Sequence, residues 1–389
     1  MKRKALILFF VTLCHLLANG QNKLDSLEAL LPNASNEQRV NILNELNIVY
    51  SHLNPTKALE LSREALDLAT ELDYKKGKAA ALNNIGVIYK NQGIYDQALE
   101  FYIESLRISD EIDDRKGLAS TMNNIGTVYS LKGVFDRALI YFIESFEIFK
   151  QLNNQQQMVG ALNNIGNAYS DKGREDKALE YYTQAIDLSL ELGDHERIFD
   201  PLSNVGNIYF YREEYNEALN YYNRSLEMER KNSNKHGEAL ALSNIGQVYL
   251  KKEDYARAEN YQTRALSIAE ELQAYPILRS IYKSLAEVYG KQGKYKQAYE
   301  TRILYDEAKE RVHNEESSRK MAQLEVAFEL QQKEKQLEIL KQDQQIQDLQ
   351  IENSRIVIIL GLMGTIIIIG AGFVYMAVRQ KNRRSFYKQ

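Results

Sequence analysis

The chain has 389 residues, of which 44% are hydrophobic and 26% are charged, and its mean hydropathy of −0.46 indicates that most of it lies in water. A single cysteine, Cys14, excludes an intramolecular disulfide. The formal net charge is −4, and because cations gather at both ends, the long stretch between them is acidic. This charge argues against a nucleic-acid or anionic-lipid partner.

The first twenty residues have the layout of a secretory signal peptide. Three cations at positions 2–4 precede an apolar stretch over 5–17 and small residues at 18–20. An apolar stretch of this length is short for a membrane span and is typical of a leader. We predict a signal peptide over residues 1–20 that is cleaved before Gln21; the alternative is a retained amino-terminal anchor.

Residues 21–38 are predicted to form a short leading helix, and a repeat with a period of forty residues follows over 39–312. Glycines recur at this period, with a tyrosine three residues after each. The glycines are Gly86, Gly126, Gly166, Gly206 and Gly246, and the tyrosines are Tyr89, Tyr129, Tyr169, Tyr209, Tyr249 and Tyr289. An earlier copy ends at Tyr50, so the repeat is present as seven units.

Each unit has the pattern of two helices joined by a tight turn. In the second unit, one face of the first helix carries Leu82, Ile85, Gly86 and Tyr89. The small residues Gly86 and Ala98 at matching depths would let the two helices approach closely. Because neither helix can bury its apolar stripe alone, the units are predicted to stack into a right-handed superhelix.

This pattern, with Ala98 followed by Tyr102 in the second helix, resembles the tetratricopeptide repeat, and its period is similar to that of the long-helix variety. The resemblance implies an all-α, right-handed superhelical solenoid, followed here by a long helix and one transmembrane helix. In the last two units Gln262 and Arg302 replace the aromatic residue of the second helix. We therefore expect these units to pack less well or to serve as a cap.

Two rows of asparagines precede the glycines of the first helices. One row consists of Asn84, Asn124, Asn164, Asn204 and Asn244, and the other of Asn83, Asn123 and Asn163. The resemblance implies that they line the concave groove, where related proteins hold the backbone of a peptide. A solvated amide both donates and accepts, so a row of them could bind an extended chain. These eight residues are the predicted partner-binding site; the alternatives are helix–helix contacts or a solvated face.

Residues 313–354 contain neither Gly nor Pro and are rich in Gln, Glu and Lys. The residues that fit a heptad seam are Leu330, Leu337, Leu340 and Ile351, and polar residues interrupt it. We predict a long, weakly coiled-coil helix that could join two copies as a homodimer; the alternative is a solvated single helix.

The stretch Ile356–Val378 contains no charged residue and is long enough to cross a bilayer as a helix. The tail over 379–389 has five cations and no acid, so the positive-inside rule places it in the cytoplasm. Together with the leader, these features predict a single-pass protein of the cytoplasmic (inner) membrane. Its transmembrane helix would span 355–378, and the bulk of the chain would lie in the periplasm or envelope.

The sequence contains no catalytic or metal-binding motif. The five histidines are scattered, and the signatures of zinc proteases, serine hydrolases and P-loop proteins do not occur. We predict no enzymatic activity, no metal and no cofactor.

The order of leader, repeats, polar helix, single span and basic tail is similar to the sensor half of bacterial membrane-bound tetratricopeptide histidine kinases and DNA-binding regulators. Those proteins continue into a kinase or helix-turn-helix domain, whereas eleven residues follow the span here. We predict a membrane-anchored extracytoplasmic protein that binds a peptide or protein in its groove. The alternative is the input half of a two-component or transcriptional signalling system, with its output domain on another chain or lost by truncation.

Overall fold

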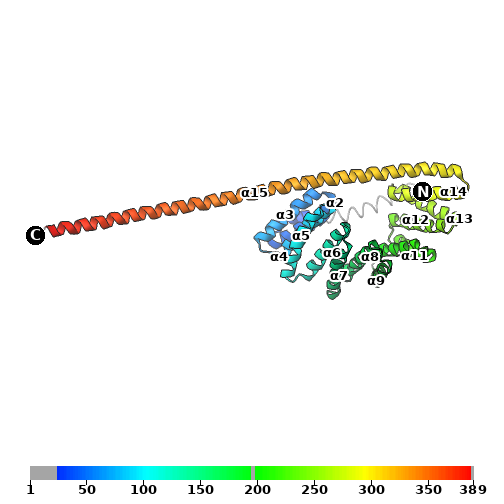
Figure 1. Cartoon of the computed structure of the whole chain (residues 1–389), viewed down its shortest axis with the longest axis horizontal. Helices are drawn as coiled ribbons and strands as arrows, with labels where there is room; N and C mark the ends of the chain where they lie inside the picture. Colours follow the sequence, from blue (N-terminus) through cyan, green and yellow to red (C-terminus); the bar gives the residue numbers. More distant parts are fainter. Residues whose placement is uncertain (1–23, 194–197, 387–389) are drawn as a thin grey trace. The chain divides into compact units, whose positions relative to one another are not determined.

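The computed structural model describes residues 24–193 and 198–386, so the predicted signal peptide lies outside the described residues. Within those ranges the chain is helical and contains no strand (Figure 1). It divides into two compact units, Met1–Ala327 and Phe328–Gln389. The boundary falls inside one long helix, α15 (Tyr295–Phe386).

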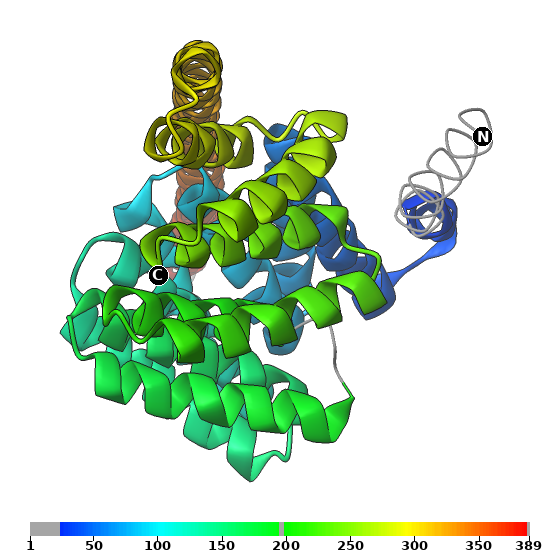
Figure 2. The same ribbon diagram turned by 90° about the vertical axis from the view of Figure 1, so that its right-hand side faces the viewer.

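The first compact unit is a row of helix pairs that pack in chain order (Figures 1 and 2). A helical stretch over 24–30 and a 3₁₀ turn, η1 (Leu31–Asn33), precede the row. The pairs are α2 (Asn36–Leu53) with α3 (Pro55–Glu71), α4 (Lys75–Asn91) with α5 (Tyr95–Glu111), α6 (Arg115–Leu131) with α7 (Phe135–Gln151), α8 (Gln155–Asp171) with α9 (Glu175–Leu192), α10 (Phe199–Tyr211) with α11 (Tyr215–Lys231), and α12 (Lys235–Lys251) with α13 (Tyr255–Glu271). Helix α14 (Tyr275–Lys291) leads into the start of α15. The predicted all-α solenoid is confirmed.

An aromatic ring of the second helix packs on the glycine of the first helix in four successive pairs. A Cβ atom placed on Gly86 would lie 2.6 Å from the ring of Tyr102, which has no exposed surface. The same contact joins Gly126 to Phe142, Gly166 to Tyr182, and Gly206 to Tyr222. The close approach of the two helices was attributed from the sequence to Gly86 and Ala98 alone. That explanation was incomplete, because the Tyr102 ring occupies the space beside Gly86.

In the sixth pair a polar side chain replaces the ring. Gln262 is fully buried, and its Nε2 donates hydrogen bonds to the Ser243 carbonyl (2.9 Å) and to Ser284 Oγ (3.0 Å). Its Oε1 accepts a hydrogen bond from Ser243 Oγ (3.3 Å). These three hydrogen bonds offset the cost of removing the Gln262 amide from water, so the loss of the ring leaves no unpaired polar group on this side chain.

The repeated tyrosines of the first helices stack on aromatic rings of their partner helices. The stacked pairs are Tyr89–Phe101, Tyr129–Tyr141, Tyr169–Tyr181, Tyr209–Tyr221 and Tyr249–Tyr261, with centroids 5.4 to 5.7 Å apart. Each stack contributes about 0.5–1.5 kcal/mol beyond the burial of its rings. The forty-residue period therefore preserves two aromatic contacts in most pairs.

The fifth pair departs from the others because its second helix buries an acidic side chain. Helix α10 has 13 residues where the other first helices from α4 to α14 have 17. Glu229 is 2% exposed, and burial, with a smaller contribution from the charge of Asp200, raises the pKa of its carboxyl to about 7. Other second helices carry an uncharged residue at this position: Ala69, Ser109, Phe149, Ser189 or Ala269. The regular packing is thus interrupted in the middle of the row.

The second compact unit consists of the rest of α15. The stretch Gln342–Gly372 is long and apolar enough to cross a membrane, by length and composition, and contains an 18-residue window with a mean hydropathy of 2.2. Of the predicted heptad seam, Leu340 and Ile351 are exposed, whereas Leu330 has no exposed surface.

The glycine–ring contact predicts opposite effects for two alanine substitutions within α8. Gly166→Ala should lower the free energy of unfolding by about 1–3 kcal/mol, because the added methyl group meets the Tyr182 ring. Gly160→Ala, which meets no atom within 4 Å, should raise it by about 0.5–1 kcal/mol through helix propensity. Urea denaturation of the full chain in detergent, followed by circular dichroism, measures both. Equal effects at the two positions would contradict the proposed packing.

Candidate functional site

Asparagines of successive first helices hydrogen-bond one another along the row of repeats. In each rung of this asparagine ladder, the Nδ2 of one asparagine donates to the Oδ1 of an asparagine in the preceding repeat. The rungs are Asn84 to Asn44 (3.1 Å), Asn124 to Asn83 (2.9 Å) and Asn164 to Asn123 (3.0 Å). The first helices of neighbouring repeats lie side by side. The Nδ2 of the second asparagine in one repeat therefore meets the Oδ1 of the first asparagine in the repeat before it.

The rungs are helix–helix contacts, one of the alternatives predicted from the sequence for these asparagines. Asn84 is only 9% exposed, and the other seven predicted site residues are half-buried. Part of each amide's hydrogen-bonding capacity is therefore used between helices. Asn44 was missed as a member, although the first copy of the repeat contains it at the equivalent position.

The hydrogen-bonding pattern of the ladder changes between the fourth and fifth repeats. Asn204 Nδ2 donates to Asn167 Oδ1 (3.1 Å) instead of reaching Asn163. The Oδ1 of Asn163 is buried and has no hydrogen-bond partner among the described residues. In the fifth repeat Ser203 replaces the asparagine of the row that contains Asn163, and its Oγ lies 3.2 Å from Ser225 Oγ. Asn244 lies on α12 as a half-buried side chain.

The buried tyrosines opposite the glycines contact the same helix face. Tyr182 donates its hydroxyl hydrogen to Asn167 Oδ1, and Tyr222 donates to Asn207 Oδ1, both at 2.7 Å. Burial raises the pKa of each phenol, so both remain donors at neutral pH. In the second repeat Val87 stands at the asparagine's position, and the Tyr102 hydroxyl is buried without a partner among the described residues.

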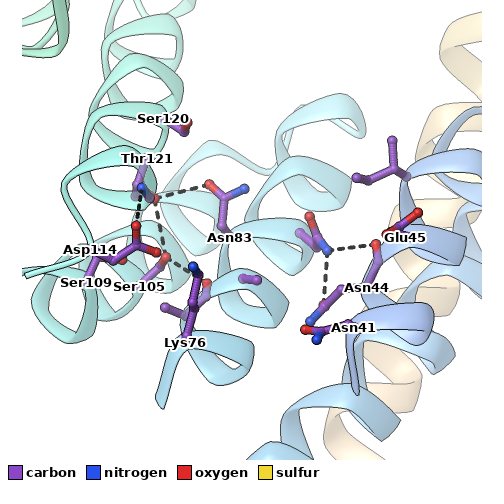
Figure 3. A pocket seen from close by; sticks show the side chains of 15 residues that line it. Asn41, Asn44, Glu45, Lys76, Asn83, Ser105, Ser109, Asp114, Ser120 and Thr121 are labelled. Carbon is purple, nitrogen blue, oxygen red and sulfur yellow. Dashed lines mark hydrogen bonds between the residues drawn. The ribbon is translucent and has the colours of Figure 1, made fainter. Parts of the chain in front are cut away.

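A cavity of about 420 Å³ opens beside the first rungs of the ladder (Figure 3). The ladder residues Asn44, Asn83 and Asn84 line it together with hydroxyl groups of α5 and α6. Its charged lining residues are Glu45, Lys76 and Asp114. The volume is within the range of ligand pockets. With its amides and hydroxyls, the cavity is suited to a polar ligand that both donates and accepts hydrogen bonds.

Within residues 24–193 and 198–386, no group of three or more His, Cys, Asp or Glu is placed to hold a metal ion. The ladder and the cavity provide binding surfaces, and neither contains a histidine or cysteine.

The chain matches a known family over more than half of its length. A family profile described as "Tetratricopeptide repeat" matches residues 77–151, 157–231 and 237–301. No curated protein sequence matches the chain.

Several solved structures share the fold. A Signal Transduction ATPase with Numerous Domains that has a tetratricopeptide repeat sensor, from Pyrococcus horikoshii, is 18% identical with a TM-score of 0.65. That match covers 74% of this chain and 45% of the ATPase, so this chain spans less than half of that protein. The apo form of RapI is 17% identical with a TM-score of 0.54, over 71% of this chain and 99% of RapI. BtubC from P. vanneervenii is 17% identical with a TM-score of 0.52, over 57% and 92%. At these identities the similarity shows the fold alone.

The two kinds of buried tyrosine should respond differently to loss of the hydroxyl. Tyr182→Phe should lower the free energy of unfolding by about 0.5–1.5 kcal/mol, because it removes the hydrogen bond to Asn167. Tyr102→Phe should leave it unchanged or raise it, because it removes a buried hydroxyl without a partner. Urea denaturation of both variants provides the comparison. A larger loss for Tyr102→Phe would refute this account of the two tyrosines.

Proposed function

The chain belongs to the tetratricopeptide repeat family, and on that premise we propose that it binds an extended peptide segment of a protein partner in the groove lined by its first helices. The observation that carries the proposal is the cavity beside the asparagine ladder. Its volume fits a short peptide segment, and its lining is rich in groups that pair with a peptide backbone.

The ladder leaves part of each amide available to such a ligand. Asn83 accepts through Oδ1, so its N–H donors are not used in the rung, and Asn124 donates from Nδ2, so its Oδ1 is not used there. Donors and acceptors therefore alternate along the groove, as do the N–H and C=O groups of an extended peptide. Because the rungs already fix the amides, a ligand would not have to order them.

We further propose that this groove is held outside the cytoplasmic membrane. The layout of residues 1–20 as a leader, the apolar stretch of α15 and the basic residues of 379–389 support this topology. In this arrangement residues 355–378 cross the membrane, and 313–354 form a helical spacer through which two copies could pair.

A second candidate function is the sensing half of a signalling system. Helix α15 continues without a break from the last repeat into the candidate span, so it provides a direct mechanical connection between them. The similar ATPase from Pyrococcus horikoshii uses its tetratricopeptide repeats as a sensor, according to its description. Both functions would use the same groove, so photo-crosslinking of the groove tests both.

Photo-crosslinking in cells tests the groove. A photoreactive amino acid in place of Ser120, which lines the cavity, should capture a protein partner, whereas the same amino acid at exposed Glu147 of α7 should not. Asn83→Asp keeps the acceptor for Asn124 and removes the free N–H donors. It should therefore lower the yield of the adduct by about 2- to 12-fold, the equivalent of one hydrogen bond.

The matched control is Asn220→Asp, an exposed residue of α11, which should leave the yield unchanged. Yields are compared per folded molecule, with thermal melts of each variant. Equal capture at Ser120 and Glu147, or an unchanged yield for Asn83→Asp, would show that the groove is not the binding site.

Cysteine labelling tests the topology. In a Cys14→Ser background, Thr183→Cys should react with a membrane-impermeant maleimide on spheroplasts, and Ser385→Cys should react only after the membrane is permeabilised. The opposite pattern would exclude the proposed orientation, and labelling of both cysteines without permeabilisation would exclude a span between them.

A further inference from the structure

The first part of α15 lies against an early repeat of the row. Gln323 Nε2 donates to the main-chain carbonyl of Asn91 at 3.2 Å, although 232 residues separate the two in sequence. Asn91 is the last residue of α4, and both residues belong to the first compact unit. In Figure 1 the yellow and orange start of α15 accordingly leads back from α14 towards the first repeats.

A second cavity, of about 630 Å³, lies at this contact. The polar and charged groups that line it include Ser51, Lys90, Asn91, Gln92, Arg319 and Gln323. None of the described residues that line it is acidic, although the chain as a whole carries a net charge of −4. The cavity is therefore a local site of positive charge on an acidic protein.

Several cations of the row are held in ion pairs that join neighbouring repeats. Lysines of later repeats pair with acids of the preceding repeat, for example Lys132 with Asp96. Among the described residues, neither Lys90 nor Arg319 takes part in an ion pair at 4.0 Å or less. The equivalent position to Lys90 is Ser130 in the next repeat, so the lysine is not a property of the repeat pattern.

Lys90 is half-buried, and burial lowers the pKa of its ammonium group. A charged group in this position lacks part of its hydration, and an anion beside it would compensate for that loss. Arg319 can present a planar pair of N–H donors to a carboxylate, and the amides of Gln92 and Gln323 can add neutral donors.

We infer that this cavity is an anion-binding site that takes a carboxylate group of the bound peptide, with Lys90 and Arg319 as its charged ligands. That the ligand is a peptide rests on the proposed function. That it carries a carboxylate rests on the positively charged lining of the cavity. Because α15 provides Arg319 and Gln323, the site is complete only when α15 lies against the early repeats. A carboxylate that binds this complete site more tightly than the separated parts therefore stabilises the contact between α15 and the early repeats.

Binding of a fluorescein-labelled hexaglutamate peptide to the full chain in detergent tests the inference. Fluorescence polarisation should show saturable binding that weakens with salt, and an amidated hexaglutamine peptide should not compete. Lys90→Met and Arg319→Met each keep an apolar stem and remove a charge. Each should weaken binding by about 10-fold or more, as expected for a hydrogen bond to a charged group.

Two exposed lysines outside the cavity supply matched controls, Lys116→Met on α6 and Lys320→Met on α15. Both should leave the affinity unchanged, and thermal melts verify that every variant folds. Absence of hexaglutamate binding, or equal loss in the control variants, would overturn the inference. Displacement of the peptide by inorganic phosphate at equal concentration would overturn a carboxylate as the specific ligand. Hexaglutamate binding that persists while crosslinking at Ser120 fails would refute the proposed groove and leave the anion site standing.

Discussion

The contact between a glycine of one helix and an aromatic ring of its partner fixes the rest of the fold. Because Gly86 has no side chain, the ring of Tyr102 lies directly on the backbone of α4 and sets the distance between the two helices. Three further pairs repeat the contact with the same period. Helices held at one distance and in one rotation present the same side chains to each neighbour, and this regularity is what allows a ladder to form along the row.

The asparagine ladder follows from that regularity. An asparagine is a poor helix former, because its amide competes for backbone hydrogen bonds. In the rungs the amides instead bond across the interface between repeats, as Asn124 does with Asn83. A rung contributes about 0.5–1.5 kcal/mol and holds both side chains in one orientation. Stability and the proposed ligand binding are therefore not exclusive roles for these residues, since a rung uses only part of the hydrogen-bonding capacity of each amide.

The exceptions to the repeat are as informative as the rule. Asn204 bonds to Asn167, which also accepts a hydrogen bond from the Tyr182 hydroxyl, and Asn163 Oδ1 has no partner among the described residues. The buried Glu229 lies in the adjacent repeat. Toward the other end, Lys90 and Arg319, which form no ion pair with a described residue, place positive charge where the row meets α15. A row of near-identical repeats thus acquires distinct sites through a few residues that do not follow the period.

The sequence by itself determined the helical pairs, their number and their stacking, because a strict period in glycine, tyrosine and alanine admits few other arrangements. It also identified the rows of asparagines. Only the tertiary structure decided what those side chains contact, since a rung joins residues about forty apart and its geometry depends on the exact offset of neighbouring repeats. The burial of Gln262 among serines was hidden for the same reason, because a glutamine in place of a ring predicts a defect unless its partners are known. The cavity at α15 was the feature least accessible to prediction from the sequence. Gln323 and Asn91 are 232 residues apart, and their contact depends on how every repeat between them is rotated relative to the one before it. No local sequence pattern encodes such a contact.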